Sequence, residues 1–212
     1  LDFPGMIMTD SGTFQSYIYG DVEVGVEEIV EFQRSIGVDV ATMLDVFSRP
    51  DMTFTQVEHC VNETLERAAV SVAAAQHTML NGPIQGGLFK ELRTKSAKGM
   101  AQHKFAIHPI GGIVPVMEQH RYKDYAKIML ATLPYLPAER PVHMFGCGHP
   151  MLFPMSIALG ADLFDSAAYA LFARDGRLLT PWGTEKIESM VDWPMLMPGV
   201  ASVSPAQVKA ME

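Results

Sequence analysis

The sequence predicts an α/β fold of the (β/α)8 TIM-barrel type, with about six of the eight β/α units in this chain. Two observations favour it. Short apolar segments of strand length alternate with amphipathic segments of helix length, as in a parallel sheet with crossover helices. Several predicted strands also end directly in an acid, a glutamine or a glycine pair. Strand ends converge on one face of a barrel, whereas an open doubly wound sheet brings only the strands beside its switch point to a site.

The six predicted strands lie in residues 6–9, 38–44, 83–87, 105–110, 141–146 and 161–165. The predicted helices lie in residues 24–36, 54–80, 88–102, 122–133 and 150–159. Thr53 is suited to cap the second helix, and Gly37 and Gly160 are suited to end the first and the last. After the sixth strand, Asp175-Gly176 predicts a hairpin turn between residues 171–172 and 178–179. We expect a barrel domain in residues 1–184 and a helical tail in residues 185–212, with a short helix at 185–191.

The composition is that of a globular protein that works in a reducing compartment. The chain has 212 residues, 48% of them hydrophobic and 19% charged, which is enough to fold around one core. Its two cysteines do not make a disulfide scaffold, so we expect a cytoplasmic protein. No apolar run reaches the roughly 18 residues of a membrane-spanning helix. The formal net charge of −8 argues against a general nucleic-acid binder, although it leaves room for a local grip on a few nucleotides.

Two aspartates at predicted strand ends, Asp10 and Asp165, are the candidate catalytic residues. Taken singly, each is as readily a helix cap or a turn residue. Taken as a facing pair, they divide the roles of nucleophile and acid or base, which suits displacement at a sugar carbon. Asp45 adds a third acid, and carboxylates pair with the donor edge of a guanine-like base. Gln85 is suited to an amide edge of such a base.

Two further groups of residues permit weaker hypotheses. His143, Cys147 and His149 invite a metal site, but their spacing is no standard zinc pattern and a fourth ligand is not evident, so an incidental polar turn is favoured. Arg174 and Arg177 flank the Asp175-Gly176 turn, where they are either solvated charges or phosphate contacts. We therefore expect no metal ligand among these residues.

Four motifs occur in an order that resembles the tRNA-guanine transglycosylase family. They are TDSGTFQ at residues 9–15, PIQGG at 83–87, PIGGIVP at 109–115 and DLFDS at 162–166. The archaeal branch fits better than the bacterial one. Bacterial members usually have a second glycine at the place of Thr13 and a Cys-containing DECTP loop where this chain has Asp45-Val46-Phe47-Ser48. FGCGHP at 145–150 also looks archaeal.

The resemblance implies a (β/α)8 barrel that exchanges a guanine in the D-arm of tRNA for 7-cyano-7-deazaguanine, on the path to archaeosine. Asp165 matches the aspartate taken as nucleophile on the ribose C1′, giving a covalent tRNA–enzyme intermediate. Asp10 matches the acid that handles the proton of the base, and some accounts of the archaeal branch make it the nucleophile, so both are kept as catalytic. The implied substrate-binding positions are Ser11, Gly12, Phe14, Asp45, Gln85, Gly112, Ile113 and Val114.

The chain departs from the family pattern in two places. Family barrels have about two β/α units before the Asp10 motif, so we expect other residues to supply them, in a homo-oligomer or from a second chain that also binds tRNA. The family also has a zinc site of three cysteines and a histidine, and Met195, Met197 and Val200 stand where the cysteines are expected. Neither thioether nor alkyl groups replace thiolates at zinc, so we expect no zinc and no other cofactor.

Two alternatives to the exchange enzyme stay open. The first is a non-catalytic paralogue that binds tRNA or scaffolds an active partner, which the lost zinc ligands suggest. The presence of both Asp10 and Asp165 argues against it. The second, from fold alone, is an unrelated barrel glycosidase or phosphate-sugar enzyme, which the four ordered motifs disfavour.

Overall fold

The computed structural model describes residues 3–13, 20, 24–180 and 182–186, which form a mixed α/β protein. The strands are β1 (Val40–Thr42), β2 (Met79–Asn81), β3 (His108–Ile110), β4 (Val142–Met144), β5 (Leu163–Phe164), β6 (Arg177–Thr180) and β7 (Gly183–Lys186). The α-helices are α2 (Val26–Ser35), α3 (Phe54–Ala75), α4 (Lys90–Met100), α5 (Val114–Glu118), α6 (Tyr122–Thr132), α7 (Phe153–Leu159) and α8 (Ala168–Arg174). Two 3₁₀ turns, η1 (Leu133–Tyr135) and η2 (Pro150–Leu152), complete the described elements.

The strands from Met8 to β5 are parallel, and each lies beside the next one in the sequence. Met8 bridges to Val40, β1 pairs with β2, and β3, β4 and β5 pair in that order. Bridges from Asn81 to Ile107 and from Ile84 to Ile110 connect the two sets. The described strands form small sheets that do not close into a ring. Sequential order differs from the order of a doubly wound sheet, in which the strand sequence reverses.

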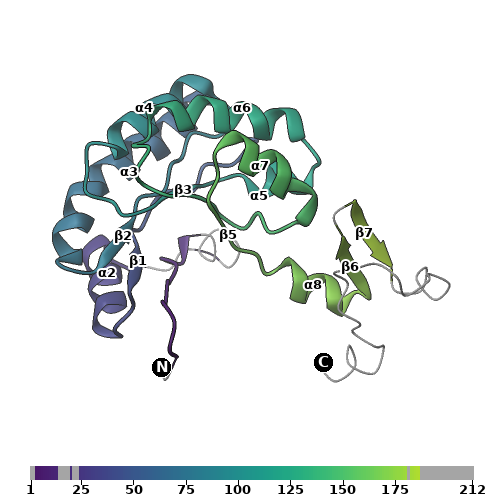
Figure 1. Ribbon diagram of the computed structural model, residues 1–212. Coiled ribbons are helices and arrows are strands. Elements are labelled where there is room, and N and C mark those ends of the chain that lie inside the picture. The colour runs from purple at the N-terminus through teal and green to yellow at the C-terminus, as the bar shows by residue number, and fades with distance from the viewer. Residues whose placement is uncertain (1–2, 14–19, 21–23, 181, 187–212) are drawn as a thin grey trace.

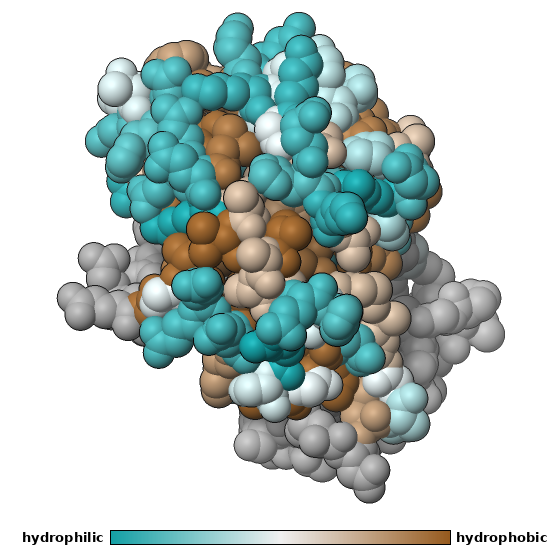
Figure 2. All heavy atoms as spheres, turned by 90° about the vertical axis from the view of Figure 1, so that its left-hand side faces the viewer, coloured by the Kyte–Doolittle hydropathy of each residue, from teal (hydrophilic) through white to brown (hydrophobic). Residues whose placement is uncertain are grey.

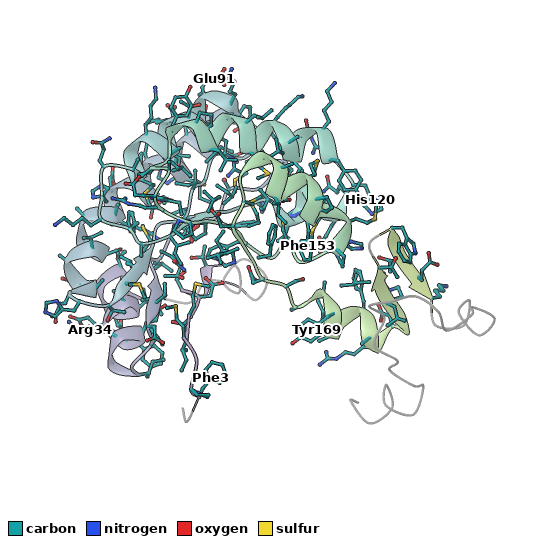
Figure 3. All side chains as sticks on the ribbon, viewed as in Figure 1. Phe3, Arg34, Glu91, His120, Phe153 and Tyr169 are labelled. Atoms are coloured by element: carbon teal, nitrogen blue, oxygen red, sulfur yellow. The ribbon has the colours of Figure 1, made fainter. Side chains whose placement is uncertain are left out.

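Helices cover the outer side of these strands (Figure 1), with α3, α4, α6 and α7 arching over them. The apolar core lies between the two layers and includes Met43, Ile84, Met100 and Met144. In Figure 3 the exposed Glu91 points outward from α4, away from the strands. Burial of these apolar side chains is the main source of stability, and it leaves the inner side of the strands free for polar side chains.

The third predicted strand begins earlier than the sequence pattern suggested. We expected one helix over residues 54–80, but α3 ends at Ala75 and β2 follows at once. Gln76 has a positive φ of 51°, which no continuing helix permits. Met79 and Leu80 continue the apolar spacing of α3, so the periodicity alone gave no sign that the helix had ended.

The prediction for the hairpin was wrong in its position. Leu171 and Phe172 belong to α8 rather than to a strand, and Gly176, at φ +64°, ends that helix. The hairpin is formed by the antiparallel pair β6 and β7, whose turn lies at Thr180 to Gly183. Glu185 and Lys186, expected to begin a helix, lie in β7, and the rest of the predicted tail lies outside the described residues.

No helix in the described ranges is both long enough and apolar enough to cross a membrane.

Candidate active site

A cleft of about 970 Å³ lies where the parallel strands end, and we call it the strand-end cleft. The segments that follow the six strands contribute to its lining, each within about four residues of the end of its strand. The contributions, in strand order, are Asp10, Asp45, Gln85, Gly111 with Gly112, Gly146 and Asp165. α8, β6 and β7 border its outer side, where Tyr169 of α8 is exposed (Figure 3). The convergence expected from the sequence is therefore observed.

A hydrogen-bonded anchor fixes the strand that carries Asp10. The side chain of Gln33, from α2, accepts from Thr9 Oγ1 at 2.8 Å and from the Thr42 backbone N–H at 2.9 Å. Thr42 Oγ1 in turn donates to the Thr9 carbonyl at 2.7 Å. These bonds join the first strand to β1, so Asp10 enters the cleft from a held backbone. The Ser11 N–H donates to Asp10 Oδ1 at 2.9 Å.

Asp165 follows β5 and is held by one of its two carboxylate oxygens. Its Oδ1 accepts from the Gly146 backbone N–H at 2.9 Å and lies 2.9 Å from His143 Nε2. Both contacts are to Oδ1, and neither uses Oδ2. The side chain is 55% exposed, whereas that of His143 is 2% exposed. An accessible carboxylate therefore sits on a buried imidazole. We call this group of three residues the Asp165 end of the cleft.

The pKa values of the two candidate catalytic acids are shifted in opposite directions. Loss of hydration raises the pKa of Asp10, the Ser11 N–H partly opposes this, and the nearby charge of Asp165 adds to it. At Asp165 burial also opposes ionisation, but the contacts with His143 and the Gly146 N–H outweigh it and lower the pKa. Two interacting carboxyl groups with separated pKa values are suited to one proton-carrying role and one anionic role.

The opposite end of the cleft is a closed network of hydrogen bonds around Gln85, which is 1% exposed. Gln85 Nε2 donates to Asp45 Oδ2 at 2.5 Å, and its Oε1 accepts from Ser48 Oγ at 2.7 Å. Ser48 Oγ accepts from the N–H groups of Gly86 and Gly87 at 3.1 and 3.0 Å. Burial raises the pKa of Asp45, against the opposing hydrogen bond from Gln85. Asp45 lines the cleft, with Oδ2 already bonded to Gln85.

A buried arginine, Arg93 of α4, supports this network from below. Its guanidinium donates to the carbonyl oxygens of Ile84, Gly87 and Gly111, each at 2.9 Å. Burial lowers its pKa to about 9. These bonds tie together the two strand ends that carry Gln85 and Gly112. Asp45, Gln85, Ser48 and Arg93 together are the Asp45 end of the cleft.

Glycine is required where the β3 strand end meets the network. A Cβ at Gly111 would stand 2.3 Å from Gln85 Nε2, and one at Gly112 would stand 2.6 Å from the Ser48 carbonyl oxygen. Gly112 also has a φ of +69°, which side-chain-bearing residues rarely adopt. The glycine pair therefore lets the backbone reach the cleft in direct contact with the amide of Gln85.

The other predicted substrate-binding residues differ in their access to the cleft. Val114 lines it, whereas Ile113, at the N-terminal end of α5, is buried in the core. Ser11 is buried and contacts Thr13 Oγ1 at 3.1 Å, so its hydroxyl supports the loop after Asp10. Gly12, with φ +84°, makes the turn of that loop. Phe14 lies outside the described residues.

The residues considered for a metal site are not gathered together. His143 contacts Asp165, Cys147 is buried beside Tyr125 with the pKa of its thiol raised to about 12 by burial, and His149 contacts Thr184 Oγ1 at 3.1 Å. Within the described ranges there is no cluster of three or more His, Cys, Asp or Glu side chains placed to hold a metal ion. Met195, Met197 and Val200 lie outside those ranges.

Sequence reasoning missed two residues that support the lining of the cleft, Ser48 and Arg93, and the role of a third, His143. Ser48 and Arg93 carry the hydrogen bonds of the Asp45 end, and His143 contacts an acid rather than a metal. The sequence did indicate a role for Arg93, because this residue lies beside Leu92 on the buried side of α4, where an unpaired cation is costly. It also indicated a role for His143, a polar residue between Val142 and Met144 in an apolar strand.

The class of protein that the fold and site define is a parallel α/β protein whose consecutive strands lie side by side, with two interacting acids in a cleft at the strand ends. Sequence comparison agrees with that class. This chain belongs to the queuine tRNA-ribosyltransferase family, whose family model matches residues 1–195.

Its relatives include archaeal proteins named tRNA-guanine(15) transglycosylase. The protein of Methanocaldococcus jannaschii is 48% identical over all of this chain and 33% of its own length, and that of Methanopyrus kandleri is 44% identical over all of this chain and 46% of its own length. A relative from Methanococcus maripaludis is 50% identical over 91% of this chain and 30% of its own length. The chain thus spans about a third to a half of the curated relatives it matches.

Proposed function

We propose that this chain carries the active site of a tRNA-guanine transglycosylase, which exchanges a guanine base in tRNA without breaking the phosphate backbone. The observation that carries the proposal is the pair Asp10 and Asp165, with opposite pKa shifts in one cleft. A single acid at a strand end could be explained equally well as a helix cap or as a catalytic residue. Two interacting acids, one favouring its proton and the other its charge, match the needs of a displacement in two steps.

In the first step, Asp165 Oδ2 attacks the ribose C1′ and forms an ester bond. The bond from C1′ to N9 of guanine breaks, and its electron pair leaves with the base. Asp10, whose pKa is raised by loss of hydration, is the proposed donor of a proton to the departing base. The negative charge of Asp165 also stabilises the positive charge that develops on the sugar ring before the ester bond forms. The products of this step are free guanine and a covalent tRNA–enzyme intermediate.

In the second step the incoming base reverses the chemistry. Asp10, now ionised, removes the N9 proton of the new base, whose nitrogen attacks C1′. The ester bond to Asp165 breaks, and its electron pair returns to the carboxylate. Both acids end in the protonation states in which they began. No oxidant, reductant or metal ion enters this balance.

The Asp45 end of the cleft is proposed to hold the base. Asp45 oxygens accept from the N1–H and the exocyclic amine of a guanine edge, and the Gln85 amide faces its carbonyl. The backbone between Gly112 and Val114 completes the edge, with Ser11 and Gly12 beside Asp10. The family resemblance adds Phe14 to the proposed substrate-binding residues. The carbonyl of Ser48 and the amide of Gln85 leave room only for glycine at 111 and 112, so this part of the backbone lies directly beside Gln85.

The particular exchange proposed is that of the archaeosine pathway, at guanine 15 in the D-arm, with 7-cyano-7-deazaguanine as the incoming base. The name of the archaeal relatives, tRNA-guanine(15) transglycosylase, supports guanine 15 as the exchanged base. We propose that the reaction takes place in the cytoplasm, where tRNA is matured.

We further propose that the six parallel strands are part of a (β/α)8 barrel completed by other residues, from a longer polypeptide, a second copy or a separate tRNA-binding chain. Phe3, Met6 and Met8 are exposed beside the first strand, and Phe32 and Ile36 on α2. On the face turned to the viewer in Figure 2, apolar residues form a band between hydrophilic ones. Further strands placed there would cover apolar surface and an open edge.

A zinc site in the tail does not fit the side chains present. Thioethers at Met195 and Met197 and an alkyl group at Val200 are poor zinc ligands. We therefore propose that this region packs without zinc and that no cofactor takes part. Elemental analysis of the dialysed protein tests this, because one zinc per chain would contradict it.

The test of function is incorporation of radiolabelled guanine into archaeal tRNA by the complete enzyme that carries this chain. We expect incorporation with the native protein and none with Asp165→Ala. Asp51→Ala is the matched control, because Asp51 is an exposed acid that does not line the cleft. Mass spectrometry of the trapped tRNA adduct should locate the ester on Asp165. Absence of incorporation by the native enzyme would overturn the proposal.

A further inference from the structure

His143 is a buried imidazole that the exchange mechanism above leaves without a role. It is 2% exposed and lies in the middle of β4, where backbone pairing with Pro109 on one side and Leu163 on the other fixes its Cα. Phe145 packs edge-on against its ring, with centroids 4.9 Å apart. The side chain is therefore held from the backbone and from one face of the ring.

In the described part of the chain, the polar group in contact with the ring is the carboxylate of Asp165. Nε2 lies 2.9 Å from Asp165 Oδ1, although the alignment of the two groups falls short of a well-formed hydrogen bond. Nδ1 has no hydrogen-bond partner in the described part of the chain. The contact to a carboxylate requires the ring proton on Nε2, and the buried Nδ1 then carries a lone pair that needs no acceptor. The ring thus presents its N–H to one oxygen of Asp165.

We propose that His143 is a positioning residue that aims Asp165 and keeps it ionised for attack on C1′. Together with the Gly146 N–H it holds Oδ1, so Oδ2 is the oxygen left to react. This inference rests on the proposed function, which supplies the reaction. The other titratable groups that act on Asp165 or His143 are Asp10, across the cleft, and the Cys147 thiol, which burial keeps protonated.

The test compares His143→Leu with His143→Gln in the complete enzyme. Leucine fills the space without a donor, whereas glutamine returns an N–H near the position of Nε2. We expect adduct formation in a single turnover to slow about tenfold or more in the leucine variant, and the acidic limb of its pH–rate profile to move to higher pH. The direction follows because removing the donor raises the pKa of Asp165, so less of it is ionised at a given acidic pH. The glutamine variant should keep most of the native rate.

A second readout does not depend on tRNA chemistry. Iodoacetamide alkylates ionised carboxylates, with iodide as the leaving group, and peptide mass spectrometry measures the pH dependence at Asp165 alone. The midpoint should rise in His143→Leu and stay near native in His143→Gln. Equal midpoints in all three proteins would overturn the role of His143, even if base exchange is observed. If leucine and glutamine are equally impaired while both remain folded, His143 is a packing residue and the proposal fails. If the native enzyme does not exchange guanine, the proposed function is wrong. The alkylation experiment still tests the effect of His143 on Asp165 in that case.

Discussion

The two ends of the strand-end cleft are built in opposite ways. At the Asp165 end a half-exposed carboxylate rests on two contacts, and its lowered pKa favours the charge. At the Asp45 end the acid is almost fully buried and its pKa is raised. Gln85 is hydrogen-bonded to Asp45 and Ser48, and Arg93 donates to the carbonyls of the neighbouring strand ends. In the proposed function this difference matches two tasks, attack by Asp165 and recognition of the base beside Asp45. A nucleophile must be accessible and charged, whereas a recognition edge must be rigid and dry.

The largest effect that separates the ends is expected from Asp165→Asn. The amide keeps the shape of the side chain but removes the nucleophile, so the exchange rate should fall by on the order of 10⁴-fold. Because the side chain is 55% exposed, the midpoint of thermal unfolding should change little. Guanine incorporation and calorimetry measure the two quantities. A strongly destabilised variant would show that this end is structural after all.

The next effect is expected at the Asp45 end, from Arg93→Leu. The substitution leaves the carbonyls of Ile84, Gly87 and Gly111 without their donor, and each buried unsatisfied group costs about 1–3 kcal/mol. The free energy of unfolding in urea should therefore fall by about 3 kcal/mol or more. Lys90→Leu, at an exposed position of the same helix, is the control and should change it by less than about 0.5 kcal/mol. Equal losses of stability in Arg93→Leu and Lys90→Leu would contradict the idea that Arg93 supports the Asp45 end.

A smaller, pH-dependent effect is expected from Asp45→Asn. Burial raises the pKa of Asp45 in the folded state, so its contribution to stability is fully present below the unfolded pKa and is lost as pH rises through the folded value. The asparagine variant lacks this loss. Its stability relative to the native protein should thus improve from acidic to neutral pH. The gain is about 1.4 kcal/mol for each pH unit by which the folded pKa of Asp45 exceeds its unfolded pKa. Urea unfolding at several pH values measures the trend, and a flat difference would contradict it.

The smallest effect is expected from Arg177→Gln on the outer border of the cleft. Arg177 pairs with Asp175 and stacks on Phe172 at 4.1 Å, and both its partners are accessible to solvent. Exposed pairs contribute about 0–1 kcal/mol, so stability should change within that range. If Arg177 contacts a tRNA phosphate, affinity should fall and the salt dependence of binding should lose about one unit of slope. Lys98→Gln, on α4 away from the cleft, should leave that slope unchanged.

The candidate site was largely predictable because acids at strand ends are readable one strand at a time. Asp10, Asp45, Gln85 and Asp165 each follow a short apolar run, and parallel strands bring such positions to one edge. The elements between them were less readable. Met79 and Leu80 continue the spacing of α3, and only the backbone at Gln76 shows that the helix has ended. The sequence at Leu171 and Phe172 is compatible with a strand or a helix. The structure places both residues in α8, where they line the cleft.

The sequence by itself determined the alternation of elements, the family and the acids at the strand ends, because these depend on local patterns and ordered motifs. Tertiary structure alone decided how the acids differ. Asp45 and Asp165 are the same residue type after similar strands, yet burial beside Gln85 raises one pKa, and contacts from His143 and Gly146 lower the other. Those neighbours come from segments far apart in the chain, so no local pattern encodes them. The roles of Ser48, Arg93 and His143 are decided in the same way.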